Sequence, residues 1–399
     1  MKWEKVTLDK LGTISRGKSK HRPRNDPSLF GGEYPFIQTS DIKNATFYIT
    51  DYTDTYNEKG LSQSKLWEPD TLCITIAANI ADTAILGIKA CFPDSVMGFI
   101  SYEGVSDVRF VKYSFDILQS EMKQISQGTA QDNLSWQKLS SITFPKPPYE
   151  TQKRIADYLF AFEKLIENNQ KQIKLLEEAA QRLYKEWFVD LRFPGHETTS
   201  IVDGMPEGWQ MKSISDFGVV ITGKTPSTSQ TEFYDGDIPF VKIPDMHNCV
   251  FPISTESTLS ELGANSQKNK YIPKNSIMVS CIATVGLVNI SVQTCQTNQQ
   301  INSIVLAKNQ DLYYLYFCMK GIRSLLDGVG SNGATMTNVN KSKFENLNVI
   351  YPTDNLIDRF HNVCEPVFSD ILKLSVMNNY LTDSRDRLLP KLMNGEIEV

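Results

Sequence analysis

The chain has 399 residues, of which 41% are hydrophobic and 22% charged, and this composition predicts a globular protein of two or three domains. It has no run of eighteen apolar residues and no apolar segment near its N-terminus, so we expect no membrane span, no secretory signal and a cytoplasmic location. The formal net charge of −5 does not indicate nucleic-acid binding, although such a sum can hide a local basic patch.

Near the N-terminus, GTISRGKS (Gly12–Ser19) fits the G-x-x-x-x-G-K-[ST] pattern of phosphate-binding loops, and GVVITGKT (Gly218–Thr225) fits it again. A working phosphate loop follows a buried strand and opens a helix. Here the preceding segment WEKVTLDKL is charged, and the following prolines, Pro23, Pro27 and Pro226, oppose a helix. We therefore expect no ATP or GTP site. The glycines suit turns between strands, and the lysines remain available for other phosphate contacts.

The two matches belong to a larger internal repeat with an offset of 204 to 206 residues. WEKVTLDKLGTISRGK aligns with WQMKSISDFGVVITGK, and YPFIQTSDIKN aligns with IPFVKIPDMHN. The matched pairs include Trp3 with Trp209, Gly12 with Gly218, Pro35 with Pro239, Asp41 with Asp245, Gly128 with Gly333 and Asn133 with Asn338. Two copies of one unit, in the same order, therefore span nearly the whole chain.

Each copy begins with short β-branched and aromatic runs, such as YPFIQTS, LCITIAA, SIMVSCIA and NSIVLA, and ends in a long helical segment. The runs predict short strands in a mixed α/β domain. The overall prediction is an α+β protein with two similar globular domains joined by two long antiparallel coiled-coil helices. The expected boundaries are a first domain at 1–147, a helix at 148–192, a linker at 193–208, a second domain at 209–352 and a helix at 353–399.

Apolar residues recur in alternating steps of four and three in both helical segments, as in a heptad seam. A helix from Glu150 to Val189 would be about 60 Å long. The second seam is weaker, and Pro366 and Pro390 should start, kink or end helices there. The predicted seam residues are Ile155, Leu159, Phe162, Ile166, Asn169, Ile173 and Leu176 in the first helix and Ile371, Leu374, Asn378, Leu381 and Leu388 in the second.

The simplest partner for each seam is the other seam. An antiparallel register that pairs Ile155 with Leu392 also places Asn169 opposite Asn378, where two polar residues would fix the alignment. Alternatively, both asparagines are solvated breaks in ordinary helices. Antiparallel pairing would hold the two globular domains apart, related by a rotation of about 180°, which suits a divided linear target such as duplex DNA.

The seven cysteines are scattered, form no C-x-x-C pair, and are accompanied by four histidines. Reduced and mostly packed thiols are therefore expected, and a zinc site is not. The sequence predicts neither a metal site nor a disulfide framework.

Four segments together resemble the specificity subunits of Type I restriction–modification systems. They are FPKPPYETQKRIADYL at the first domain-to-helix junction, LYKEWFVDLRFPG at the end of the first helix, DGMPEGWQ, and RDRLLPKLMNGEIEV at the C-terminus. The plan of domain, helix, domain and helix also matches, and the resemblance covers essentially the whole chain. The second junction, YPTDNLIDRF, departs from the pattern because it lacks the double proline and the glutamine.

The resemblance implies that each globular domain is a target-recognition domain for one half of a bipartite site in double-stranded DNA. The helices would set the unread spacer and dock two methyltransferase (modification) subunits. The chain itself would perform no chemistry and bind no cofactor. S-adenosylmethionine, ATP and magnesium would belong to the methyltransferase subunits, which methylate adenine, and to the restriction/translocase subunits.

Candidate DNA-binding residues are the side chains that match base edges or phosphates and lie in the loops of the two domains. An ordinary solvated or polar loop is the alternative for each of them. In the first domain they are Arg16, Lys18, Lys20, Arg22, Arg24, Gln38, Thr39, Ser40, Gln127, Thr129, Gln131 and Asn133. In the second they are Lys224, Thr225, Lys242, Asn298, Gln299, Gln300, Asn332, Thr335, Thr337 and Asn338.

Two other functions fit parts of the sequence. A fused modification enzyme would need a catalytic domain beside two recognition domains, for which the chain is too short, and methyl-donor motifs are missing. A scaffold that does not bind DNA would not explain why basic and amide-rich loops recur at the same place in both copies. The negative net charge suggests that partners supply part of a positive channel, which predicts weak, salt-sensitive DNA binding by the isolated subunit.

Overall fold

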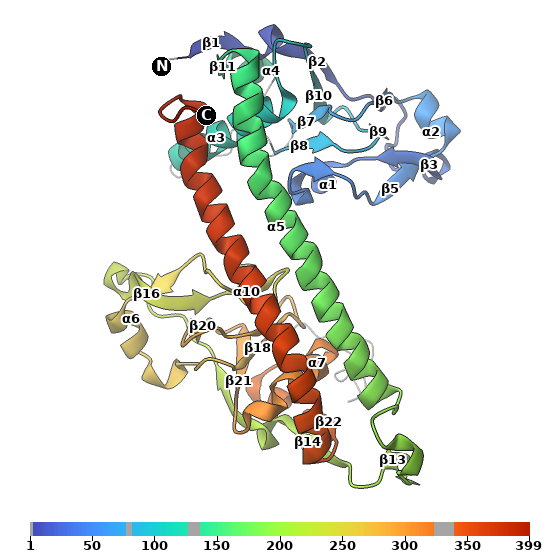
Figure 1. The fold of residues 1–399 in the computed structure, drawn as a ribbon, viewed down its shortest axis with the longest axis vertical. Helices are drawn as coiled ribbons and strands as arrows, with labels where there is room; N and C mark the ends of the chain where they lie inside the picture. The colour runs from blue at the N-terminus through green and yellow to red at the C-terminus, as the bar shows by residue number, and fades with distance from the viewer. Residues whose placement is uncertain (1–2, 77–81, 127–135, 323–338) are drawn as a thin grey trace. The chain divides into compact units, whose positions relative to one another are not determined.

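The computed structural model describes residues 3–76, 82–126, 136–322 and 339–399, which form two compact units. Unit 1 consists of Met1–Glu167 and Tyr380–Val399, and unit 2 consists of Asn168–Asn379. Each unit combines a globular α/β part with a section of both long helices (Figure 1). The predicted fold class is confirmed.

Two sheets and a two-stranded ribbon build the globular part of unit 1. The order in the main sheet is β2 (Gly12–Arg16), β10 (Val96–Ser101), β7 (Leu72–Thr75), β8 (Thr83–Leu86) and β4 (Tyr48–Ile49). The second sheet has the order β5 (Asp54–Tyr56), β3 (Phe30–Phe36), β9 (Ala90–Cys91) and β6 (Leu66–Trp67). The ribbon pairs β1 (Glu4–Thr7) with β11 (Thr143–Lys146). The helices of this part are α1 (Thr39–Asn44), α2 (Glu58–Ser62), α3 (Val108–Ser126) and α4 (Trp136–Ser141).

Unit 2 repeats this plan, and within its described residues each of the two sheets has one strand fewer than in unit 1. Its main sheet has the order β15 (Gly218–Thr222), β21 (Ile301–Leu306), β18 (Ile277–Ser280) and β19 (Val288–Ile290). The second sheet has the order β17 (Thr258–Leu259), β16 (Tyr234–Val241) and β20 (Gln296–Thr297), and β14 (Gln210–Ser213) pairs with β22 (Asn348–Tyr351). The helices are α6 (Glu261–Asn265), α7 (Leu312–Lys320) and α9 (Lys341–Glu345).

The repeat extends to the way individual helices are capped. Asn57 begins α2 by accepting a hydrogen bond from the amide of Gly60, at 3.1 Å. Ser260 begins α6 by accepting the corresponding hydrogen bond from Gly263, also at 3.1 Å. Asparagine and serine are both good N-cap residues, so two different side chains satisfy the same backbone requirement. The internal repeat predicted from the sequence is confirmed at this level of detail.

Both predicted long helices are present. Helix α5 (Tyr149–Tyr184) continues as a π-helical turn over Lys185–Val189, and α10 (Asp354–Met393) is continuous for 40 residues. Helix α10 therefore neither begins nor ends at Pro366 or Pro390, so of the three expected outcomes, a start, a kink or an end, the structure excludes the start and the end. An interior proline costs a helix about 3 kcal/mol through a lost hydrogen bond and a clash. Around Pro366 the burial of Cys364 and Phe368 in the core of unit 2 offsets this cost.

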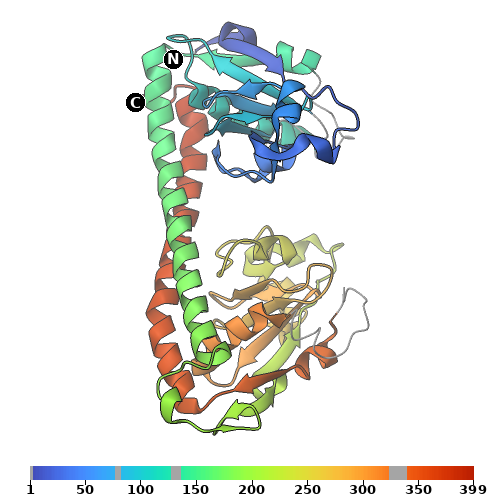
Figure 2. The ribbon, with the colours of Figure 1, turned by 90° about the vertical axis from the view of Figure 1, so that its right-hand side faces the viewer.

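Within each unit the two long helices lie side by side and antiparallel (Figures 1 and 2). In unit 2 the Nδ2 of Asn169 donates a hydrogen bond to the Oδ1 of Asn378 at 2.9 Å. In unit 1, Ile155 and Leu392 share one hydrophobic core. The predicted register is confirmed, and the alternative of two solvated asparagines is wrong, because Asn169 is only 5% exposed.

None of the predicted seam residues is exposed to solvent. Five of them are buried, namely Ile155, Leu159, Ile166, Asn169 and Ile371. Seven are partly buried, namely Phe162, Ile173, Leu176, Leu374, Asn378, Leu381 and Leu388. An ion pair also crosses the helix pair in unit 1, where Arg385 donates to Glu163 at 2.9 Å.

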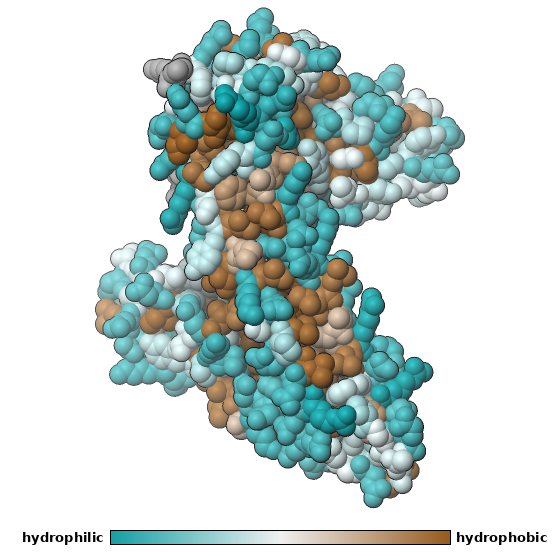
Figure 3. Space-filling model, viewed as in Figure 1, coloured by the Kyte–Doolittle hydropathy of each residue, from teal (hydrophilic) through white to brown (hydrophobic). Residues whose placement is uncertain are grey.

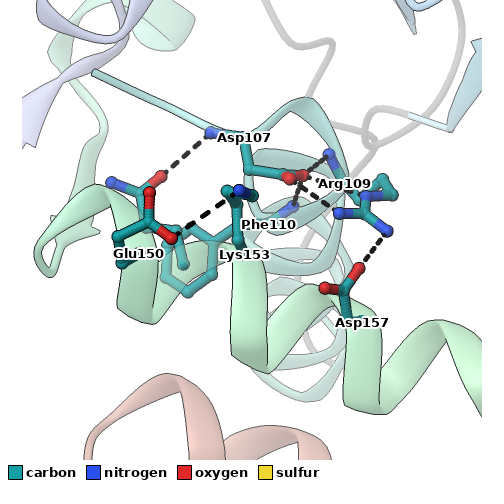
Figure 4. Close-up of polar contacts among 7 residues, drawn as sticks. Asp107, Arg109, Phe110, Glu150, Lys153 and Asp157 are labelled. Atoms are coloured by element: carbon teal, nitrogen blue, oxygen red, sulfur yellow. Dashed lines mark hydrogen bonds and ion pairs between the residues drawn. The ribbon is translucent and has the colours of Figure 1, made fainter. Parts of the chain in front are cut away.

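The start of α5 is fixed to the globular part of unit 1 by a polar cluster (Figure 4). Asp107 caps α3 by accepting a hydrogen bond from the amide of Arg109 at 2.8 Å. The Arg109 guanidinium also contacts Asp157 on α5, at 2.7 Å. The buried side chain of Gln152 donates to the carbonyl of Pro147 and accepts from the amide of Asp107. These contacts hold the direction in which α5 leaves its domain.

The second junction lacks these residues but places its helix at the equivalent position. Strand β22 ends at Tyr351, and α10 begins at Asp354. The Thr353 hydroxyl accepts a hydrogen bond from the amide of Leu356 at 3.4 Å. The segment predicted as a linker carries a short hairpin, β12 (Ile201–Val202) and β13 (Met205–Pro206).

The remaining general predictions concern cysteines and membranes. All seven cysteines are free thiols, six of them buried, as expected for a reduced protein. Across the described ranges, no helix is both long enough and apolar enough to cross a membrane.

Candidate DNA interface

The second glycine–lysine turn packs against the segment Thr297–Ile301 of unit 2. The amide of Gly223 donates to the carbonyl of Ile301 at 3.0 Å, and the amide of Lys224 donates to Thr297 at 2.9 Å. A Cβ on Gly223 would lie 2.2 Å from the carbonyl oxygen of Asn298. The glycine is therefore required by the close approach of another loop. The backbone amides of Gly223 and Lys224 donate to protein carbonyls and are therefore not directed at a phosphate.

The first glycine–lysine turn has the same role in unit 1. The amide of Gly17 donates to Val96 at 2.8 Å, and the amide of Lys18 donates to Phe92 at 3.1 Å. A Cβ on Gly17 would lie 2.2 Å from the carbonyl oxygen of Pro93. No helix opens directly after either lysine in the described segments. The two phosphate-loop matches are thus one repeated structural turn.

The predicted basic residues at the end of β2 and in the loop after it are exposed, and two of them contact a common carboxylate. Arg16, Lys18 and Lys20 are exposed along this segment. The Arg24 guanidinium contacts Asp94 at 2.5 Å, and Arg22 contacts the same carboxylate at 3.5 Å. This pairing orders two long side chains on the surface of unit 1.

A histidine–aspartate contact holds the same loop. The Nε2 of His21 lies 2.7 Å from Asp26. The pKa of Asp26 is lowered to about 2, chiefly because its carboxylate accepts a hydrogen bond from the Ser28 amide and also contacts His21. Asp26 is therefore ionised at neutral pH and helps to fix the loop that carries the arginines.

A cavity of about 380 Å³ brings together three of the predicted residues, Arg24, Gln38 and Thr39. The amide of Gln38 donates to Asp41 at 2.7 Å, which caps α1, and its side-chain amide donates to Asp54. The fourth candidate of this region, Ser40, is exposed on α1. The structure thus groups residues that are separated in the sequence.

In unit 2 the two predicted loops also meet. The Thr225 hydroxyl donates to the side-chain carbonyl of Gln299 at 2.7 Å. Asn298 is only 7% exposed, and its side chain donates to Gln300 at 2.9 Å, so it shapes its own loop. Lys242, at the position equivalent to Gln38, donates to the Ser257 hydroxyl at 2.7 Å. Lys224 is exposed beside this loop pair.

Eight predicted residues lie outside the described part of the chain. They are Gln127, Thr129, Gln131, Asn133, Asn332, Thr335, Thr337 and Asn338. For the residues that the structure does describe, no group of three or more histidine, cysteine, aspartate or glutamate side chains could hold a metal ion.

The residues that sequence reasoning missed are acidic. Asp94 binds two arginines, and Asp54 lines the cavity beside Arg24. A search for DNA-binding residues favours cations and amides because phosphates repel carboxylates, so single aspartates in loops gave no signal. Only the fold shows that these carboxylates face the basic segment.

Comparison with known proteins identifies the family. The family model described as the Type I restriction modification DNA specificity domain matches residues 1–178 and again residues 206–356. One match lies in each copy of the repeat, and the second match ends at residue 356, near the start of α10. The chain therefore belongs to the family of Type I restriction–modification DNA specificity subunits.

Full-length relatives agree with this assignment. The chain is 31% identical to the Type I restriction enzyme HindI specificity subunit of Haemophilus influenzae, over 97% of this chain and 98% of that protein. It is 27% identical to the MjaIX specificity subunit of Methanocaldococcus jannaschii, over 100% of this chain and 94% of that protein. In fold it is similar to the crystal structure of an S subunit from M. genitalium, with a TM-score of 0.58, 13% identity, and coverage of 98% of this chain and 96% of that one.

Proposed function

We propose that each globular domain of this specificity subunit reads one half of a bipartite target in double-stranded DNA, and that helices α5 and α10 set the spacer between the halves. The observation that carries the proposal is the double match of a DNA specificity domain, one match on each copy of the repeat. Within unit 2 the hydrogen bond between Asn169 and Asn378 aligns the two helices, which supports their proposed role as a paired spacer element.

The chemistry is assigned to partner subunits. Two methyltransferase subunits would transfer a methyl group from S-adenosylmethionine to adenine at the site that this chain selects. Restriction/translocase subunits would use ATP and magnesium. Support comes from the glycine–lysine turns, where the amides that a phosphate loop would offer are bound to protein carbonyls.

The long helices are the proposed docking surface for the methyltransferase subunits. Unit 1 exposes Tyr158 and Leu165 on α5 and Tyr380 on α10, with exposed fractions of 47%, 51% and 67%. Unit 2 exposes Leu175 on α5 and, on α10, Val363 and Met377. Hydrophobic side chains gather over α10 in Figure 3. Apolar side chains outside the seam of a paired helix mark a surface for protein partners.

A substitution pair tests the docking proposal. Leu175→Glu places a charge on α5, and we expect it to abolish co-purification with the methyltransferase subunit. Val219→Glu is the matched control, because Val219 has the same exposed fraction of 64% but lies on β15. Equal co-purification of both variants would refute docking at this part of the helix.

The chain carries a net charge of −5, so binding of DNA by the isolated subunit should be weak. Partners would supply part of the positive surface, and affinity should fall steeply with salt. Tight specific binding by the subunit alone at about 0.15 M salt would contradict this part of the proposal.

The function itself is tested by mapping N6-methyladenine across a genome. The chain is expressed with its methyltransferase subunits in a host that lacks other adenine methylation, and the map is compared with a culture that lacks this chain. We expect one bipartite motif that depends on the chain. An identical map in both cultures, with the partners expressed, would refute the proposal.

A further inference from the structure

We propose that the cavity of unit 1 reads one G·C base pair in the major groove, with Arg24 binding the guanine and Asp54 binding the cytosine. The inference rests on the proposed function, because it assumes that unit 1 binds a DNA half-site. It adds the identity of one base pair and the side chains that select it.

The cavity combines groups from three parts of the sequence. Arg24 comes from the loop after β2, Gln38 precedes α1, and Asp54 begins β5. Helix α1 and strand β5 lie close to each other in unit 1 (Figure 1). The aromatic rings of Phe30 and Phe36, with centroids 5.9 Å apart, form part of the lining. Apolar walls limit competing water and so strengthen the hydrogen bonds that a base edge makes there.

Arg24 is ordered but retains free donors. Its guanidinium contacts Asp94 at 2.5 Å through Nη2, and its side chain is 48% exposed. A guanidinium has five N–H donors, so the remaining edge can donate two parallel hydrogen bonds. Guanine presents two acceptors, N7 and O6, at the spacing that an arginine fork matches. Asp94 is therefore a positioning residue for Arg24.

Asp54 explains why the site favours a base pair over a phosphate. A carboxylate only accepts hydrogen bonds, and its charge is repelled by the DNA backbone. Gln38 donates to the Asp54 carboxylate and orients it, which leaves further acceptor positions unfilled by that bond. The amino group of cytosine is the base donor that aspartate accepts in the major groove.

Together the two side chains distinguish G·C from A·T. The G·C edge offers two acceptors on guanine and one donor on cytosine, which match two donors on Arg24 and one acceptor on Asp54. An A·T edge places the adenine amino donor where Arg24 also donates, and the thymine acceptor where Asp54 also accepts. Both mismatches leave polar groups unpaired.

Unit 2 carries a different pair at the same positions. Phe36 pairs with Asp54 across β3 and β5, and the equivalent Phe240 donates its amide to the Ser257 carbonyl at 3.1 Å. Asp54 thus corresponds to Ser257, which accepts from Lys242. The carboxylate–amide pair belongs to unit 1, so the inference predicts an effect on one half of the target only.

The test uses the full chain with its methyltransferase subunits and a genome-wide map of N6-methyladenine. Arg24→Gln is expected to preserve the bipartite motif but relax one position of one half-site, a position that is G·C in the wild-type motif. The preference for G·C over the other base pairs at that position should fall about tenfold or more. Asp54→Asn, which is isosteric, should relax the same position. Asp94→Asn should relax it as well, an outcome that a purely structural role would not produce.

Lys89→Gln is the control, because Lys89 is a cation of unit 1 in an exposed ion pair with Glu68 and does not line the cavity. It should leave every letter of the motif unchanged. An unchanged motif in Arg24→Gln, relaxation at an A·T position, or a uniform loss of methylation by a variant with the wild-type melting temperature would each overturn the inference. Failure of the wild-type chain to direct any bipartite motif would instead refute the proposed function.

Discussion

Asn169 and Asn378 meet across the seam of α5 and α10, and their hydrogen bond should be measurable as a coupling free energy. The two side chains are joined at 2.9 Å, and Asn169 is 5% exposed. Replacing either residue by leucine removes this hydrogen bond, and Asn378→Leu leaves the buried amide of Asn169 facing an apolar side chain. An unsatisfied buried amide costs about 1–3 kcal/mol, which the added leucine offsets in part. We expect each single variant to be destabilised by about 1 kcal/mol net.

The double variant should behave differently from the sum of the singles. With both asparagines replaced by leucine, no buried amide is left unpaired, and the seam becomes fully apolar at that layer. Replacing both partners by apolar groups is nearly neutral or stabilising. The double variant should therefore be at least as stable as the wild type, which gives a coupling free energy of about 1–3 kcal/mol.

Differential scanning calorimetry of the four proteins measures this coupling. Unit 2 holds both asparagines and comprises Asn168–Asn379. For a unit of this size, 1 kcal/mol corresponds to about 2–4 °C in melting temperature. Single variants that melt within 1 °C of the wild type, or changes that add with a coupling below about 0.5 kcal/mol, would refute the reasoning.

Three further predictions follow from the packing. Glu163→Ala removes one of the two carboxylates that Arg385 contacts, the other being Asp386, and should cost about 1–3 kcal/mol in denaturant unfolding. Lys373→Ala, in an exposed ion pair, should cost less than about 0.5 kcal/mol, and equal effects would contradict this. Gly223→Ala should lower the melting temperature of unit 2, because the added Cβ would lie 2.2 Å from the carbonyl oxygen of Asn298. Because no nucleotide site is expected at this turn, ATP with magnesium should not shift the melting temperature of the wild type. Thiol titration with Ellman's reagent at pH 8 should be slow in the native protein and yield seven thiols after denaturation, because burial raises the pKa of groups such as Cys281 to about 11; rapid reaction of the six buried thiols in the native protein would be inconsistent with this packing.

Short-range pattern was enough to predict most of the architecture. The heptad spacing gave the helix pair and its register, because residues three and four apart necessarily share a helix face. The asparagine in each seam then aligned the two helices. The repeat predicted two similar domains, and the glycine–lysine motifs were predicted to form turns, which the structure contains.

The ends of the second long helix were harder to predict, because they depend on contacts between residues that are distant in the sequence. Local propensity predicted a start, a kink or an end of a helix at Pro366, but α10 runs through it, with buried side chains on either side. The second helix starts at Asp354 although its junction lacks the glutamine that braces the first. Propensity is a local term of a few kcal/mol, and tertiary packing outweighs it.

For the candidate site, the sequence by itself determined which loops carry basic and amide side chains, since composition and the repeat locate them. Only the tertiary structure decided that Arg24 and Asp54 share one cavity, that Asp94 orders the arginine, and that Asn298 is buried. These relations join residues brought together by strand pairing and loop packing. Spacing along the chain records periodicity within one element, but it does not record which side chains converge when separate elements fold against each other.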